Sequence, residues 1–133
     1  MSHSLITGIS GFAGRHLAIM LLASGERVSG LARDPLPPDA IPDALGPVDF
    51  RKADLNDLDD LRHQFEALKP DRVYHLAGWA SVGRSMDDPP GPFLANTVGT
   101  FHLLEALRTT GFKGRLLLVS SADVYGATAN RGG

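Results

Sequence analysis

The chain has 133 residues, a formal net charge of -2 and no cysteine, and 43% of its residues are hydrophobic. This length fits one domain that buries a core without disulfide bonds. The lack of cysteine excludes a disulfide scaffold, a cysteine-ligated metal site and thiol catalysis, and no metal site is expected. Basic residues are scattered singly, so nucleic acid is not an expected partner. No apolar run approaches the roughly 20 residues that cross a bilayer, and no signal peptide is visible, which predicts a cytoplasmic protein without membrane contact.

The first half of the chain alternates strand-length apolar runs with segments of helical period. Residues 4–7 are predicted to form a strand and 12–24 a helix, which Gly25 ends in a left-handed conformation. Residues 27–32 form the second strand, the proline-rich 34–47 a loop, and 48–52 the third strand. Asp54 is predicted to cap the next helix, which Pro70 ends. The inner face of that helix is Leu55, Leu58, Leu61, Phe65 and Leu68.

In the second half, residues 72–77 form a fourth strand that the run from Val73 to Leu76 predicts to be buried on both faces. A turn-rich segment, 87–92, precedes a long helix with the apolar stripe Leu94, Val98, Phe101, Leu104 and Leu107. Residues 115–121 form the fifth strand. The alternation predicts an α/β fold in one domain, residues 1–133: a doubly wound (Rossmann) parallel sheet of order 3-2-1-4-5. Its ligand crevice would lie between strands 1 and 4.

Three glycines stand where the first strand turns into the first helix: Gly8, Gly11 and Gly14. Gly8 permits a tight turn, Gly11 lets the backbone approach a pyrophosphate, and Gly14 lets helix and strand pack closely. The free amides at the helix start would face the phosphates. The placement favours nucleotide binding over a merely structural turn.

The spacing G-x-x-G-x-x-G, with Phe12 after the second glycine, resembles the extended short-chain dehydrogenase/reductase family, most of whose members act on nucleotide sugars. Four further matches follow in order: Ala53-Asp54-Leu55, His75-Leu76-Ala77-Gly78, Asn96-Thr97-Val98-Gly99-Thr100 and Ser120-Ser121-Ala122-Asp123-Val124-Tyr125-Gly126. Among the branches, residues 73–85, Asp88-Pro89 and Asp123 look most like GDP-4-keto-6-deoxy-mannose reductases and GDP-mannose 4,6-dehydratases.

The resemblance implies a set of cofactor contacts. Asp54 would accept a hydrogen bond from the adenine amino group, or would only cap a helix. Leu76, Ala77 and Gly78 would leave room for ribose and phosphates, and Asn96 would pack near the active site. His75 is interpreted as a satisfied core histidine. The expected cofactor-binding residues are Gly8, Ser10, Gly11, Phe12, Ala13, Gly14, Arg33, Asp54, Leu55, Leu76, Ala77, Gly78 and Asn96.

Arg33 ends the second strand, where NAD-specific relatives carry an acid for the 2′-hydroxyl. A guanidinium pairs with a 2′-phosphate, so NADP is the expected cofactor. The neighbouring Asp34 keeps NAD open.

For catalysis, the resemblance implies that Ser121 polarises the carbonyl or hydroxyl being reduced or oxidised. Asp123 stands where dehydratases keep an acid for proton transfer, or else caps a turn. Ser81, Val82 and Arg84 would border the sugar, although Arg84 is equally consistent with a surface loop.

The Tyr-x-x-x-Lys pair on which hydride transfer in this family depends is not present in these residues. We therefore expect the chain alone to be inactive, as the cofactor-binding part of a larger enzyme. That enzyme is predicted to be an NADP-dependent reductase or dehydratase of a GDP-linked 4-keto-6-deoxy hexose. The alternatives are an NAD-dependent nucleotide-sugar 4-epimerase or dehydratase, and a non-catalytic dinucleotide-sensing module. A homodimer or higher homo-oligomer is expected; the free edge of the fifth strand would be covered by a partner chain, be disordered or promote association.

Overall fold

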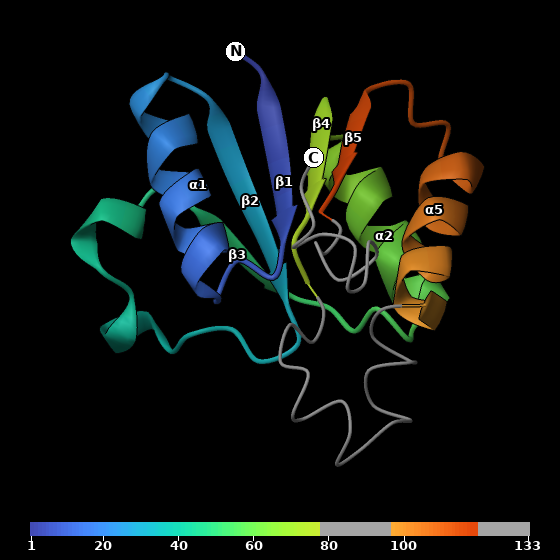
Figure 1. The fold of residues 1–133 in the computed structure, drawn as a ribbon, viewed down its shortest axis with the longest axis horizontal. Helices are drawn as coiled ribbons and strands as arrows, with labels where there is room; N and C mark the ends of the chain where they lie inside the picture. Colours follow the sequence, from blue (N-terminus) through green and yellow to red (C-terminus); the bar gives the residue numbers. More distant parts are fainter. Residues whose placement is uncertain (78–96, 120–133) are drawn as a thin grey trace, which may run out of the picture.

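The computed structural model describes residues 1–77 and 97–119. Five parallel strands form one sheet in the order β3-β2-β1-β4-β5 (Figure 1). The strands are β1 (His3–Thr7), β2 (Arg27–Ala32), β3 (Asp49–Lys52), β4 (Arg72–His75) and β5 (Arg115–Leu118). The helices are α1 (Phe12–Ala23), α2 (Leu58–Leu68) and α5 (Gly99–Thr109), with two short 3-10 turns, η1 (Pro38–Ala40) and η2 (Asp43–Leu45), in the proline-rich loop. The predicted doubly wound fold and strand order are confirmed.

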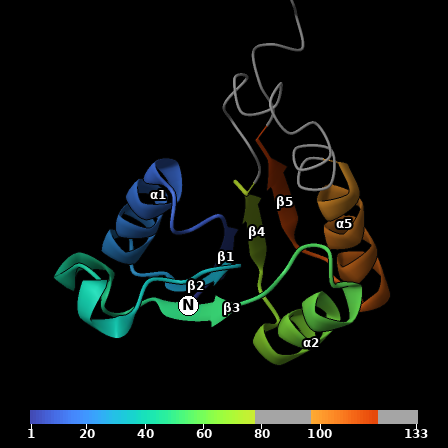
Figure 2. The ribbon, with the colours of Figure 1, turned by 90° about the horizontal axis from the view of Figure 1, so that it is seen from below.

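Helices cover both faces of the sheet, α1 on one side and α2 with α5 on the other (Figure 2). Successive residues of β1 point to opposite faces, so Leu5 packs into the core under α2 and α5 while Ile6 packs into the core under α1. Both side chains are fully buried. Because β1 lies at the centre, its carboxyl end and that of β4 meet where the strand order reverses direction.

The first helix ends as the sequence predicts. Gly25 has φ +84°, its N–H donates to Leu22 O at 3.0 Å, and the N–H of Glu26 donates to Leu21 O at 3.1 Å. This pair of bonds closes the helix with a left-handed glycine directly after its cap. The chain can therefore turn at once into β2.

The prediction that Asp54 caps the second helix is wrong. The cap is Asp57, whose Oδ1 accepts from the N–H of Asp60 at 3.1 Å. Asp54 instead accepts from the N–H of Asn56 at 2.9 Å and forms a separate turn between β3 and the helix. Leu61, Phe65 and Leu68 are buried as predicted. At the other end, Lys69 in a left-handed conformation, before Pro70, ends the helix.

The apolar stripe predicted for the long helix is largely misplaced. Within α5 the buried residues are Gly99, Leu103, Ala106 and Leu107, whereas Phe101 is 61% and Leu104 43% exposed. Small residues at two of the buried positions allow α5 to approach the sheet and α2 closely. Of the predicted stripe, Leu94 lies outside the described residues, and of the other four Leu107 alone is buried.

The prediction that the fourth strand is buried on both faces holds for one face. Val73 and His75 are buried under α2 and α5, but Tyr74 is half-buried on the other face. There it neighbours Leu117 of β5, which is 52% exposed. Among the described helices, α1 alone lies on that side, above β1 and β2.

Candidate functional site: the glycine turn and the carboxyl ends of the central strands

The turn after β1 fits together only with glycine at its two ends. Gly8 has φ +73°, and a Cβ built there would lie 2.7 Å from the backbone N of Ala77. A Cβ on Gly14 would lie 2.5 Å from Gly8 O and 2.7 Å from the Cα of Ile9. Gly8 also donates its N–H to Leu31 O at 3.1 Å. The turn is thus held tightly between β2, β4 and the first turn of α1.

The amino end of α1 carries no side-chain cap. Its N-cap is Gly11, with φ -78° and ψ 172°, and its first turn has no acidic residue. The hydroxyl of Ser10 is buried and has no partner among the described residues. Free amides at a helix start, the positive end of the helix dipole and an unsatisfied hydroxyl together suit an anionic group. This end of α1 therefore fits a diphosphate.

Sequence reasoning missed Arg15, whose Nε donates to Ser10 O at 3.0 Å. Arg15 is half-buried beside the glycine turn, and its guanidinium forms no ion pair within the described residues. The residue follows the last glycine of the motif directly, which is the signal that could have found it. It adds a positive charge where the helix start already attracts anions.

Arg33 and Asp34 follow β2, at the carboxyl edge of the sheet. The Nε of Arg33 lies 3.6 Å from Oδ2 of Asp34, and their side chains are 71% and 84% exposed. An exposed pair of this kind contributes little to stability. Both side chains are therefore free to turn toward a ligand.

Asp54 also stands at this edge, because the N–H of Ala53 donates to Ala32 O at 3.0 Å and joins the end of β3 to that of β2. Its side chain is exposed. Leu55 is half-buried against the core under α2 and α5. Its carbonyl oxygen lies 2.8 Å from Nδ1 of His102. The structure therefore brings Asp54, but not the Leu55 side chain, to the open side of the crevice.

At the end of β4, Leu76 and Ala77 lie beside the glycine turn. The N–H of Leu76 donates to Thr7 O and the N–H of Ala77 to Thr7 Oγ1, each at 3.2 Å. Phe12, which follows Gly11, is 83% exposed, and Ala13 is exposed beside it. The described part of the predicted cofactor set, apart from the Leu55 side chain, thus gathers along one edge.

Several predicted residues lie outside the described ranges. They are the catalytic candidates Ser121 and Asp123, the substrate candidates Ser81, Val82 and Arg84, and the cofactor candidates Gly78 and Asn96. Their roles stay predictions. Within the described ranges no cluster of histidine and acidic residues is arranged to hold a metal ion, and none of the helices is long and apolar enough to span a membrane.

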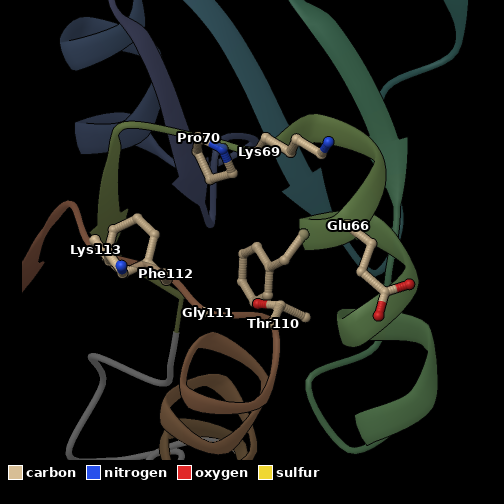
Figure 3. Close-up of a pocket in the computed structure, with 8 residues that line it drawn as sticks. Glu66, Lys69, Pro70, Thr110, Gly111, Phe112 and Lys113 are labelled. Carbon is tan, nitrogen blue, oxygen red and sulfur yellow. The ribbon is translucent and has the colours of Figure 1, made fainter.

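A cavity of about 300 Å³ lies elsewhere, between the carboxyl end of α2 and the loop after α5 (Figure 3). Lys69, Thr110, Phe112 and Lys113 are among its lining residues. The neighbouring Asp71 donates its N–H to His3 O, at the start of β1. This cavity is therefore at the amino ends of the strands, opposite the glycine turn.

Two buried histidines have a lowered pKa, His3 at the start of β1 and His75 at the end of β4. Burial is the main cause for both, and the charge of Arg27 adds to it for His3. His75 is satisfied by hydrogen bonds at both ring nitrogens, as the sequence interpretation held. The folded chain thus prefers both rings neutral.

We expect the free energy of unfolding to fall on acidification below about pH 7. Because the pKa of each histidine is lower in the folded than in the unfolded chain, the unfolded chain binds more protons between the two values, and stability rises with pH there. Urea unfolding at about pH 7.5 and about pH 5.5 measures the change. The double variant His3→Asn/His75→Asn should flatten this dependence, and an equally steep dependence in that variant would contradict the assignment.

A family model described as GDP-mannose 4,6 dehydratase matches residues 5–132. The chain is 40% identical over 124 residues to the GDP-6-deoxy-D-mannose reductase of Pseudomonas aeruginosa, covering 93% of this chain and 35% of that protein. It is 38% identical over 128 residues to the UDP-glucose 4-epimerase of Mycolicibacterium smegmatis, covering 92% and 40%. The chain thus spans well under half the length of these curated relatives.

Solved structures show the same likeness. The UDP-glucose 4-epimerase of Stenotrophomonas maltophila, with bound NAD and formylated UDP-arabinopyranose, matches with a TM-score of 0.85 and 27% identity over 95% of this chain and 39% of that one. The UDP-glucose 4-epimerase of Bifidobacterium longum, in complex with NAD⁺ and UDP, also matches with a TM-score of 0.85, at 29% identity over 94% and 38%. The resemblance that the motifs indicate is confirmed: the chain belongs to the GDP-mannose 4,6 dehydratase family of the extended short-chain dehydrogenases/reductases.

Proposed function

We propose that the chain binds a nicotinamide dinucleotide along the carboxyl ends of β2, β1 and β4, with the diphosphate on the amino end of α1. The observation that carries this proposal is the uncapped start of α1 beside the partnerless Ser10 hydroxyl. Phosphate oxygens would satisfy both, and Gly11 carries no side chain to keep them away. The guanidinium of Arg15 would add to the attraction.

The position of the rest of the dinucleotide can be inferred from which strands end at the same edge of the sheet. The adenosine half would extend past β2 toward Arg33 and Asp54, since both residues stand at that edge. There Arg33 would pair with a 2′-phosphate and Asp54 would accept from the adenine amino group. Leu76, Ala77 and Gly78 would line the opposite wall. The bound cofactor would supply or accept a hydride, and the described residues would hold it in place.

We further propose that the protein acts on a nucleotide sugar, as an NADP-dependent reductase or dehydratase of a GDP-linked 4-keto-6-deoxy hexose. Ser121 would donate to the C4 carbonyl oxygen, and Asp123 would be an acid for proton transfer. Ser81, Val82 and Arg84 would contact the sugar. The likeness to a GDP-6-deoxy-D-mannose reductase supports this branch.

A second candidate is an NAD-dependent nucleotide-sugar 4-epimerase. Asp34 beside Arg33 favours it, because a carboxylate at this edge can accept from an adenosine 2′-hydroxyl. Neighbouring structures described as epimerases with NAD point the same way. NAD retained through purification would support the epimerase, whereas freely exchanging NADPH would support the reductase.

Calorimetric titration of the purified chain with NADPH, NADH and ADP-ribose tests the dinucleotide proposal. We expect saturable binding with a Kd below about 1 mM for all three, and the tightest binding for NADPH. Saturation-transfer NMR with GDP-mannose and UDP-glucose then tests the substrate class, with GDP-mannose expected to give the stronger signal. No binding of any dinucleotide at millimolar concentration would contradict the proposal.

A further inference from the structure

Two buried histidines lie on the same face of the sheet, at opposite ends. His3 contacts Leu68 O through Nδ1 at 2.9 Å and Ser29 Oγ through Nε2 at 2.7 Å. His75 contacts Thr7 Oγ1 through Nδ1 at 2.7 Å and Thr100 Oγ1 through Nε2 at 3.1 Å. The two rings are similarly buried. They differ in place, because only His75 stands at the edge where the dinucleotide is proposed to bind.

The hydroxyl of Thr7 fixes the proton on His75. Thr7 Oγ1 already accepts from the N–H of Ala77 at 3.2 Å, and Thr7 is 1% exposed. Its own O–H has an acceptor if Nδ1 of His75 is unprotonated, and within the described residues no other acceptor for it is recorded. Nε2 then carries the ring proton and donates to Thr100 Oγ1. Protonating Nδ1 would leave the Thr7 hydroxyl proton buried without an acceptor, which is costly.

This chain of bonds ends at the glycine turn. Thr7 is the last residue of β1 and pairs in register with His75 of β4. The amide that its hydroxyl holds, that of Ala77, is the atom that a Cβ on Gly8 would touch. Through Thr7, His75 can therefore influence the distance between the Gly8 turn and the end of β4, although its ring contacts neither Gly8 nor Ala77 in the recorded hydrogen bonds.

We propose that His75 is a positioning residue of the dinucleotide site: in its neutral form it orients the Thr7 hydroxyl that holds the Ala77 amide against the Gly8 turn. This inference rests on the proposed dinucleotide binding. When His75 gains a proton or is replaced by a residue without an acceptor, the wall of the crevice loosens and dinucleotide affinity falls.

Among the described residues that contact or pair with His75, none has an ionisable side chain, so His75 is the group that can titrate there. Among the described residues, β1 presents Thr7 to it, α5 presents Thr100, and β5 pairs Leu118 with it in register. None of these side chains is ionisable. Burial lowers the pKa of His75, and no charged group among the described residues contributes to that shift.

Calorimetric titration with NAD⁺ at about pH 7.5 and about pH 5.5 tests the inference. NAD⁺ is the probe because it lacks the 2′-phosphate, which would itself titrate in this range. We expect the wild-type affinity to fall only about threefold to fivefold at the lower pH, because burial lowers the pKa of His75 and leaves part of the rings unprotonated there. His75→Asn keeps an acceptor for Thr7 but does not titrate, so its affinity should change less than about twofold between the two pH values.

Two other variants separate positioning from stability. Thr7→Val removes the hydroxyl without changing the shape of the side chain, and should show the weakened affinity at both pH values. His3→Asn is the matched control: it replaces the other buried histidine and should lower the thermal midpoint while leaving the pH dependence of NAD⁺ affinity as in the wild type. Circular dichroism confirms that each variant is folded.

The possible outcomes distinguish a failure of the role inferred for His75 from a failure of the proposed dinucleotide binding. A wild-type chain that does not bind NAD⁺ at either pH overturns the proposed function and this inference together. Binding that does not change with pH, or that falls equally in His75→Asn, overturns only the role of His75. An equal loss of affinity in His3→Asn would show that general destabilisation is the cause, and would also overturn it.

Discussion

Replacing Gly11 with alanine should remove most dinucleotide binding while leaving the fold nearly intact. The backbone of Gly11, at φ -78° and ψ 172°, is extended and open to any residue. A Cβ there would lie 3.3 Å from Gly8 O, which a shift of a few tenths of an ångström relieves. We expect a stability cost of about 1 kcal/mol or less. The same methyl group would stand where the diphosphate approaches α1, and the affinity should fall about a hundredfold, close to 2.8 kcal/mol.

Two other glycines make this prediction specific. Gly8→Ala combines a positive φ with a clash against the backbone of Ala77, so it should lower both stability and affinity. Gly25→Ala also places alanine at a positive φ, but no atom lies within 4 Å of the new Cβ. It should cost about 1 to 2 kcal/mol of stability and leave dinucleotide affinity unchanged.

Thermal unfolding and NADPH titration of the three variants measure the two effects separately. Unchanged affinity in Gly11→Ala would show that the diphosphate does not approach this residue. A loss of affinity in Gly25→Ala would mean that binding merely follows stability. Only the combination of a stable Gly11→Ala chain with weak binding supports the proposed position of the diphosphate.

Local patterns predicted most of the fold. Strand bounds and order follow from apolar runs and right-handed crossovers, and Gly25 marks the end of α1 because few other residues adopt its conformation. The start of α2 could not be decided in this way. Asp54 and Asp57 both precede the apolar periodicity, and what separates them is a turn in which the N–H of Asp57 donates to Asp54 O at 2.9 Å. That turn carries no distinct sequence signal.

The buried side of α5 shows a second limit of sequence reasoning. The helix has apolar residues on more than one side, so periodicity alone selected Phe101 and Leu104, which the structure leaves exposed. Packing against α2 and the sheet instead selects the side with the small residues Gly99 and Ala106. The spacing of apolar residues does not indicate which side of the helix can approach α2 and the sheet most closely.

In the candidate site too, the local features could be predicted from the sequence and the long-range contacts could not. The glycine turn is local, a single run of seven residues from Gly8 to Gly14, and could be recognised from its spacing. The bond between Thr7 and His75 joins residues 68 positions apart, and the bond between His75 and Thr100 joins residues 25 apart. Their side chains are brought together only by the pairing of β1 with β4 and the packing of α5, so the role of Thr7 had no signal in the sequence.

Replacing Arg33 with alanine should weaken NADPH binding by about 1 to 3 kcal/mol and leave NADH binding almost unchanged. A guanidinium at the end of β2 can form a charge-assisted, bidentate contact with a 2′-phosphate, whereas NADH offers only a hydroxyl there. In the free chain Arg33 is paired loosely with Asp34, at 3.6 Å with both side chains exposed, so little is lost when the guanidinium turns to the phosphate. Titration with both cofactors measures the ratio of the two affinities.

The matched control is Arg108→Ala. Arg108 is 70% exposed, close to the 71% of Arg33, and it too pairs with a neighbouring acid, Glu105. It stands in the last turn of α5, at the amino edge of the sheet, so its loss changes the net charge equally without touching the proposed crevice. If Arg108→Ala weakened NADPH binding as much as Arg33→Ala, long-range charge rather than contact would explain the effect.

The variant Asp34→Asn tests the choice between NADP and NAD through the acidic neighbour of Arg33. If the site takes NADP, removing this carboxylate should strengthen NADPH binding, because it relieves repulsion of the 2′-phosphate and frees Arg33. If the site takes NAD, the same change should weaken NADH binding by about 1 kcal/mol or more, because the 2′-hydroxyl loses its acceptor.

Equal losses for both cofactors in Arg33→Ala would show that Arg33 does not recognise the 2′-phosphate. A loss confined to NADH in Asp34→Asn would then assign the edge of β2 to NAD.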